Sequence, residues 1–229
     1  MSNEHVRLPP GRDAIELASA PSVPTVSRET GGFPAVRNLT RDGRMTMKFP
    51  SHINLPREAR VELVELLNTC LATSIDLHWQ VKQAHWNIRG RDFISRHELF
   101  DDVADHVRKQ ADAFAERAGA LGGYAQGTIR LAARRSELEE YDLSAINGDD
   151  HIRVLVERVA VYASTIRGGI QRCADLNDPV TEDLFTQTLS EVEQDLWFLE
   201  SHLYGSAAGA RAEVAPSAIL EERSSSPNA

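Results

Sequence analysis

The sequence predicts an all-α protein built around a ferritin-like four-helix bundle. Residues 56–204 repeat apolar side chains every three or four positions, and no stretch alternates as a strand would. Two short connections flank one long connection, which is the arrangement of a bundle with a single crossover. We therefore divide the chain into a flexible N-terminal arm at 1–55, the bundle at 56–204 and a flexible C-terminal tail at 205–229.

The first two helices are bounded by residues that begin and end helices. Pro56 suits a first helical turn, and apolar side chains then recur at helical spacing to about Trp86. Residues 87–92 are predicted to form a short turn. The second helix is expected from about Phe93 to Leu121, because two glycines follow it.

The second pair of helices follows a long connection. Residues 124–148 are too many for a simple turn, and we expect a short helix within them around Asp142–Ile146. A third helix is expected from near Asp149 until it is broken at residues 177–179. The fourth helix carries bundle-like apolar spacing and is expected to end at Gly205.

The predicted bundle is acidic. The formal net charge of the chain is −9 at pH 7. The arm carries seven basic and five acidic side chains and the tail carries two and three, which leaves −10 on the bundle. Such a body repels nucleic acid and anionic lipid at long range. We expect DNA binding to be weak where it occurs at all, and to be insensitive to deleting residues 1–50, because the arm is only faintly basic.

Several features predict a cytoplasmic location. The first residues, MSNEHVRLPPGRD, contain no apolar run of the kind found in signal peptides. No segment approaches the length of apolar sequence that crosses a bilayer, so no membrane partner is expected. Cys70 and Cys173 fall in helical stretches, which favours buried thiols over a disulfide. Nucleoid association stays open as an alternative, and it would require DNA binding.

Four side chains of metal-ligand type share one face of the second helix. With His97 at 0° and about 100° per residue, Asp101 falls near 40°, Asp112 near 60° and Glu116 near 100°. One chain cannot bring them to a single ion, because Asp101 and Asp112 are about 16 Å apart along the helix axis. The Glu-x-x-His pattern of an intra-bundle di-iron site is also absent.

The residue numbers indicate how the ligand set could be completed. His97 with Glu116 and Asp101 with Asp112 give the same sum, 213. Two antiparallel copies of one helix across a two-fold axis obey such a rule. The two ligand pairs would then meet between chains, twice in each dimer. Asp105 and Arg108 obey the same rule, and we expect them to form an ion pair near the dimer axis.

A solvated helix surface is the alternative interpretation of this face. Against it, Asp101 with Asp105 and Asp112 with Glu116 are like charges at i, i+4 spacing. Each such pair costs an isolated helix about 0.2–0.5 kcal/mol. A bound cation would offset that cost, and oxygen-rich ligation with one or two imidazoles suits iron, manganese or zinc.

His85 is the natural additional ligand, because it ends the first helix just across the tight turn from His97. His78 lies on nearly the same face, and we interpret it as a core or interface histidine. His106 points away from the stripe and is interpreted as structural. The remaining histidines form no cluster: His5, His52, His151 and His202.

Four segments carry a resemblance to a known family: KQAHWNIRG (82–90), FISRHELFDD (93–102), DAFAERAGALGG (112–123) and LWFLESHL (196–203). They resemble the Dps family, the small ferritin-like proteins of bacteria. The resemblance covers about residues 55–204. Its most specific part is the spacing His–x11–His–x3–Asp–x10–Asp–x3–Glu.

The resemblance implies a hollow dodecameric homo-oligomer that takes Fe(II) and hydrogen peroxide as substrates and stores the ferric product. Its ferroxidase activity would belong to di-iron centres at two-fold interfaces, where zinc or manganese could substitute for iron. The family ligands correspond to His85, His97, Asp101, Asp112 and Glu116. Hard carboxylates suit this chemistry because they stabilise Fe(III) more than Fe(II).

The resemblance also implies roles for neighbouring residues. Trp86 corresponds to a tryptophan that can intercept radicals, although an interface aromatic is an equally good interpretation. Lys82 corresponds to a lysine near the site. Acidic side chains around three-fold channels would draw Fe(II) inward. The candidates, which a solvated surface explains equally well, are Glu157, Asp175, Asp178 and Asp183.

Two other functions stay open from the sequence. One is a nucleoid-compacting protein in which the metal site is mainly structural. The best-known family members hold DNA with lysine-rich tails, whereas this arm has a single lysine. The other is an intersubunit metal site, such as a zinc site, that only stabilises the dimer. The leading hypothesis is an iron-oxidising mini-ferritin.

Overall fold

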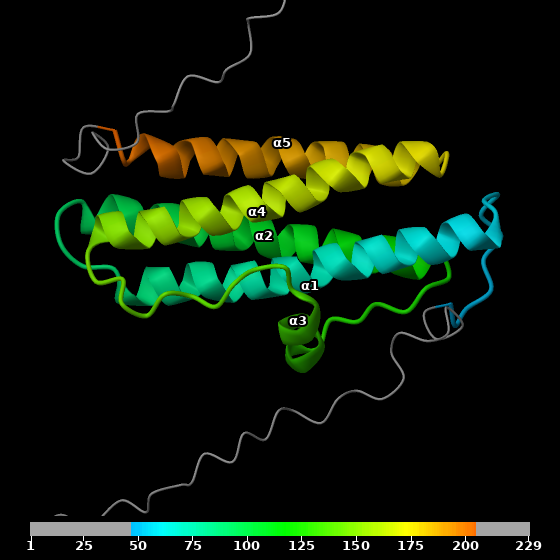
Figure 1. The fold of residues 1–229 in the computed structure, drawn as a ribbon, viewed down its shortest axis with the longest axis horizontal. Helices are drawn as coiled ribbons and strands as arrows, with labels where there is room; N and C mark the ends of the chain where they lie inside the picture. Colours follow the sequence, from blue (N-terminus) through cyan, green and yellow to red (C-terminus); the bar gives the residue numbers. More distant parts are fainter. Residues whose placement is uncertain (1–46, 205–229) are drawn as a thin grey trace, which may run out of the picture. The chain divides into compact units, whose positions relative to one another are not determined.

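The computed structural model describes residues 47–204, and this part of the chain is helical without a named strand (Figure 1). Residues 1–46 of the predicted arm and the whole predicted tail lie outside the described residues. The helices are α1 (Arg57–Asn87), α2 (Phe93–Ala120), α3 (Ile129–Arg135), α4 (Gly148–Asp175) and α5 (Pro179–Ser201).

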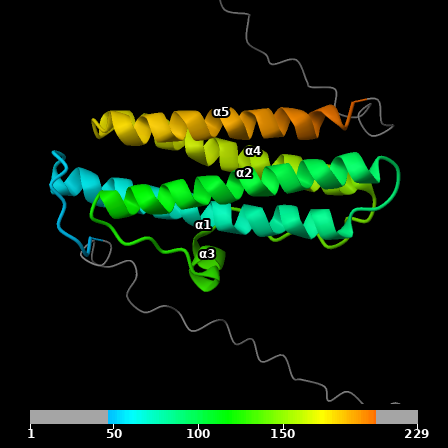
Figure 2. The ribbon, with the colours of Figure 1, turned by 180° about the vertical axis from the view of Figure 1, so that it is seen from behind.

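The four long helices form the predicted bundle. α1 packs mainly against α2, and α4 mainly against α5. The chain between α2 and α4 runs back along the bundle, so these two helices point the same way, as both views show (Figures 1 and 2). Short turns join the members of each pair. This is the ferritin-like topology, and the predicted fold class is confirmed.

Aromatic and branched side chains from all four long helices fill the core. Phe114 of α2 and Phe185 of α5 are fully buried, with ring centroids 5.2 Å apart. Gly169 lets α4 approach this pair, because a Cβ there would lie 2.2 Å from the ring of Phe185. Burying one large apolar side chain stabilises the fold by about 1.5–3 kcal/mol.

Side-chain caps fix the starts of the second helix pair. The Asn147 side chain accepts hydrogen bonds from the backbone N–H groups of Asp149 and Asp150, and the Asp150 carboxylate accepts from the backbone N–H of Asn147, which is a capping box. α4 therefore begins within one residue of the predicted position. Asp178 caps α5 by accepting from the backbone N–H of Thr181.

The predicted short helix at Asp142–Ile146 is wrong, because the short helix of the connection is α3, at Ile129–Arg135. The Asp142 side chain instead accepts from the backbone N–H of Ser144, a local turn that competes with a helix. Ile146 is 74% exposed, so no packing would support a helix there. α3 has that support, since its Ala132 is buried and it packs on α1.

The last residues of the predicted arm pack on the end of α2. The backbone N–H of Phe49 donates to Gly122 O at 3.1 Å, and the Ser51 hydroxyl donates to Ala120 O at 3.2 Å. Gly122 has φ +86°, and a Cβ there would lie 2.6 Å from Phe49 O. A glycine is therefore needed where α2 stops.

Among residues 47–204, none of the helices combines the length and the apolar character that crossing a membrane requires.

Candidate metal centre

Two histidines hold each other where α1 ends and α2 begins. The rings of His85 and His97 stack with centroids 3.6 Å apart and an interplanar angle of 23°. The contact is reciprocal: His85 Nδ1 donates to His97 O at 2.9 Å, and His97 Nδ1 donates to His85 O at 3.0 Å. The five residues between the helices make this pairing possible, because they return the chain directly beside α1.

The reciprocal bonds fix the chemistry of both rings. A carbonyl oxygen only accepts hydrogen bonds, so Nδ1 carries the proton in each neutral histidine. The lone pair is then on Nε2, which is the usual state of a metal-ligating imidazole whose other nitrogen is held by the backbone. His85 is buried and His97 is half-buried, so both rings are ordered by packing as well.

A carboxylate lies beside the two histidines. Lys82 Nζ donates to Asp101 Oδ1 at 2.5 Å, and His85 Nδ1 lies 3.6 Å from the same oxygen. The hydrogen bond from Lys82, together with the charge of its ammonium group, holds the pKa of Asp101 below its ordinary value. The Asp101 side chain is 56% exposed. An ionised, accessible oxygen donor therefore stands next to two imidazoles.

The other predicted ligands lie at the opposite end of α2. Asp112 and Glu116 are exposed, and neither has a hydrogen bond or ion pair with any residue of 47–204. Between the two ends, Arg108 Nε lies 3.6 Å from Asp105 Oδ1 of the same chain, and both side chains are exposed. The predicted contact of these two residues between chains stays a prediction.

One chain brings together part of the predicted ligand set. Lys82, His85, His97 and Asp101 meet, whereas Asp112 and Glu116 do not join them. Within residues 47–204 of a single chain, no group of three histidine, cysteine or carboxylate side chains is placed to hold a metal ion. The complete five-ligand centre at a two-fold interface therefore stays a prediction.

Two exposed tryptophans lie on α1, and one of them directly follows His85 in the sequence. Trp86 is 53% and Trp79 48% exposed, and their ring centroids are 6.2 Å apart. His78 contacts Trp79 edge-on at 5.0 Å and donates from Nδ1 to Ala104 O at 2.9 Å. His78 is thus satisfied within the chain, while the tryptophans offer an unpaired apolar surface.

The remaining histidines have structural partners or lie apart. His106 Nδ1 lies 3.1 Å from a carboxylate oxygen of Asp195, whose pKa is raised by burial. His151 Nδ1 lies 2.6 Å from the buried Tyr141 hydroxyl. His52 is exposed, and His5 lies outside the described residues.

The four channel candidates differ in their surroundings. Glu157, Asp175 and Asp183 are exposed. Asp178 is only 2% exposed and accepts from Arg117 Nη2 at 2.8 and 3.0 Å. Because Asp178 caps α5 and neutralises Arg117, it offers no exposed carboxylate in this subunit.

The chain is similar to proteins of known family. A family model for the ferritin-like domain matches residues 64–205. The DNA protection during starvation protein of Agrobacterium fabrum is 37% identical over 150 residues, which cover 66% of this chain and 93% of that protein. The protein of the same name from Mycolicibacterium smegmatis is 33% identical over 145 residues, covering 62% and 77%. The solved structure of DpsA14 from Streptomyces coelicolor has 32% identity and a TM-score of 0.66, covering 70% of this chain and 95% of that one.

The helical bundle and the family match define a ferritin-like protein. Within that class, the similarity over nearly the full length of its relatives places the chain in the Dps family, and the predicted resemblance is confirmed.

Proposed function

We propose that this protein is a Dps-type mini-ferritin, which oxidises Fe(II) at centres shared by two-fold-related copies. The ferric product is stored as an oxide inside a hollow dodecamer. The observation that carries the proposal is the division of the ligand stripe on α2. A fixed histidine–histidine–carboxylate group lies at one end, and two carboxylates without partners in 47–204 lie at the other.

The roles follow from the chemistry of the donors. His85 and His97 bind Fe(II) through Nε2, and Asp101, Asp112 and Glu116 supply hard oxygens that favour the ferric state. Lys82 holds Asp101 in place until metal binds. Trp86 follows His85 in the chain and is exposed, which supports a role in intercepting radicals.

Hydrogen peroxide is the proposed oxidant. Each of two Fe(II) ions gives one electron, the O–O bond breaks, and two protons complete two water molecules. Because both electrons leave together, no hydroxyl radical is released. Zinc or manganese would compete for the same donors. The relatives are named for DNA protection, and removing Fe(II) and peroxide would protect DNA without requiring tight DNA binding.

A complementation experiment tests whether each centre needs two chains. One variant carries His97→Ala with Asp101→Asn, and the other carries Asp112→Asn with Glu116→Gln. Each protein alone should oxidise Fe(II) very slowly, since every centre lacks half its ligands. In a mixed dimer, one centre keeps all ligands and the other loses both halves.

Co-expression of the two variants should restore part of the activity. Random pairing makes half of the dimers mixed, so about a quarter of the parent rate should return. Co-expression avoids any need for preformed shells to exchange subunits, and native mass spectrometry confirms that the assemblies are mixed. Mixed assemblies as inactive as either variant would show that the ligands do not meet across a two-fold axis. Activity in either variant alone would show that one end of α2 suffices.

A further inference from the structure

A cavity rich in arginine lies at the end of the bundle where α1 turns into α2, α4 begins and α5 ends (the left end in Figure 1). Its volume is about 580 Å³. We call it the arginine pocket, after four of its lining residues, which are Arg89, Arg91, Arg96 and Arg153. None of its lining residues belongs to the candidate metal centre.

The charge of the arginine pocket is opposite to that of the bundle. Among residues 47–204, its acidic lining residues are Asp92 and Asp149, against four arginines. The bundle as a whole is strongly acidic. Four guanidinium groups around one concave surface repel each other unless something compensates them, and a cavity focuses their field on whatever enters it.

The carboxylates present compensate this charge only in part. Arg96 Nη1 pairs with Asp149 at 2.9 Å, but Arg96 is only 7% exposed and its Nε–H has no hydrogen-bond partner among the described residues. Gly148 leaves room for this guanidinium, because a Cβ there would lie 2.1 Å from Arg96 Nη1. A buried donor without an acceptor is costly, and it is rare in folded proteins.

The other arginines also keep donors available. Arg153 Nη1 pairs with Asp150 at 2.9 Å, and Arg89 Nη1 donates to Ile88 O at 2.6 Å, which leaves further N–H groups on each. Arg91 has no hydrogen bond or ion pair with any residue of 47–204. The pocket therefore presents several unused guanidinium donors.

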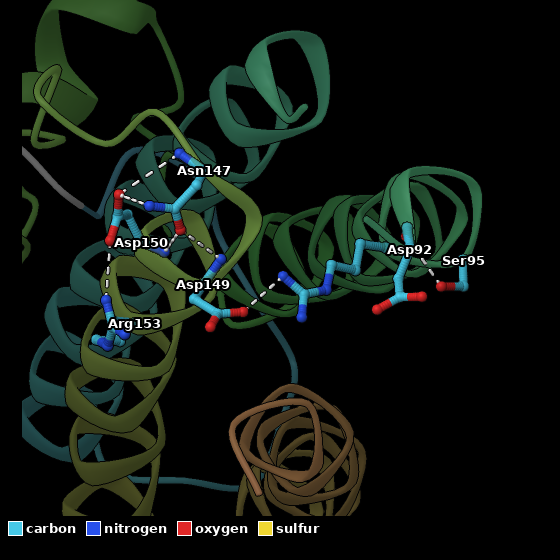
Figure 3. A network of polar contacts seen from close by, with 7 residues as sticks. Asp92, Ser95, Asn147, Asp149, Asp150 and Arg153 are labelled. Carbon is cyan, nitrogen blue, oxygen red and sulfur yellow. Dashed lines mark hydrogen bonds and ion pairs between the residues drawn. The ribbon is translucent and has the colours of Figure 1, made fainter. Parts of the chain in front are cut away.

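The start of α2 adds to this preference for an anion, whereas the start of α4 is capped by Asn147 and Asp150. Figure 3 shows Asp92 and Ser95 at the start of α2 beside Asn147, Asp149 and Arg153 at the start of α4. The first turn of α2 contains no acidic residue, and Asp92 makes no side-chain cap. The partial positive charge of that helix terminus is therefore not neutralised by a cap.

We propose that the arginine pocket binds the phosphate group of a small molecule. Phosphate matches it because several guanidinium groups can each donate two bonds to a tetrahedral dianion. The cavity is of the size used for small ligands and exceeds a lone phosphate. His202 and Tyr204 line the rest of the space and offer rings to a sugar or base.

Calorimetric titration of the full-length assembled protein with inorganic phosphate, at constant ionic strength, tests the proposal. Arg91→Ala removes a donor that no described residue uses, and should weaken binding about tenfold. Asp92→Asn removes a negative charge that makes no side-chain hydrogen bond, and asparagine tolerates the φ of 59° at this position. It should tighten binding roughly two- to fivefold.

The matched control is Arg57→Ala, which removes an exposed arginine from the opposite end of α1, about 45 Å away. It should leave the affinity unchanged. A titration with adenosine monophosphate separates the ligand sources, because tighter binding than phosphate assigns a phosphomonoester and equal binding assigns free phosphate. The proposal fails if phosphate does not bind saturably, if Arg57→Ala weakens binding as much as Arg91→Ala, or if Asp92→Asn does not tighten it.

Discussion

The ligand side chains at the two ends of α2 differ in whether other residues of the chain hold them in place. At the first end, His97 is fixed to His85 by reciprocal backbone bonds, and Asp101 is fixed to Lys82. At the other end, Glu116 has no partner in 47–204, although its neighbour Arg117 is bound tightly to α5 through Asp178. The backbone is secured at both ends, but the ligand side chains are secured at only one.

This difference indicates a division of work within one proposed centre. A fixed histidine pair sets the position of the metal at low entropic cost, because its rotamers are already chosen. Free carboxylates can change from one binding mode to another as iron goes from ferrous to ferric. A dimer would bring the fixed histidine pair of one chain and the free carboxylates of the other chain to every centre.

Substituting a histidine of the fixed pair should reduce the Fe(II) oxidation rate more than any other change. His97→Ala deletes a donor and also the hydrogen bond that its Nδ1 makes to the backbone of α1, so the Fe(II) oxidation rate should fall about a hundredfold. Glu116→Gln removes one donor and disturbs no contact within 47–204, so the Fe(II) oxidation rate of this variant should fall only about tenfold. Stopped-flow absorbance with peroxide compares them, and equal losses would contradict the division of work.

The ion pair between Arg117 of α2 and Asp178 of α5, which we call the anchor, should contribute to the stability of the fold. Asp178→Asn keeps the cap of α5 but removes the charge that pairs with Arg117, and should lower the free energy of unfolding by about 2 kcal/mol. Urea denaturation measures it. Asp175→Asn is the matched control, because this carboxylate is exposed and should change the free energy by less than about 0.5 kcal/mol. Similar changes in the free energy of unfolding for both variants would show that the ion pair of Asp178 with Arg117 does not stabilise the fold.

The pH dependence of that anchor has a definite sign. Burial acts to raise the pKa of Asp178, but hydrogen bonds from Thr181 and Arg117 outweigh it and hold the pKa below the ordinary 3.8. A carboxylate with a depressed pKa stabilises the folded state above its unfolded pKa, and this is lost as the pH falls through the folded pKa. The difference between parent and Asp178→Asn should therefore be constant near neutrality and shrink below about pH 4.

The smallest effect is expected from Lys82. Lys82→Met leaves Asp101 ionised and more than half exposed, so water can replace the lysine and the oxidation rate should fall only about threefold. Lys109→Met, on an exposed lysine of α2, should leave the rate unchanged. A loss as large as that of His97→Ala would make Lys82 part of the centre itself.

Helix bounds were predictable where the signals are local. Pro56 and the glycines after α2 placed the first two helices to within about two residues, and α4 begins one residue before the predicted Asp149. α5 ends at Ser201 rather than near Gly205, because a turn at residues 202–204 stops it earlier. The short helix was misplaced because α3 depends on packing against α1, which no local pattern shows.

The candidate site was predictable in its residue types and not in its contacts. Helical spacing identified the stripe on α2 and pointed to His85. The reciprocal hydrogen bonds between the rings and carbonyls of His85 and His97 could not be predicted. Every residue has a backbone carbonyl, and only the geometry of the turn decides which carbonyls the two rings reach. The arginine pocket was missed for a related reason: its residues come from three separate stretches of the chain.

The reciprocal histidine contact has a consequence for insertions and deletions. A helix rotates about 100° with each residue, so one residue inserted in α2 between His97 and Asp101 would turn the His97 ring away from His85 and break both bonds. The irregular stretch at 136–147 can absorb added residues without turning any ligand. The position of His97 in α2 is therefore fixed. We expect natural or engineered changes in length to be tolerated in the crossover at 136–147.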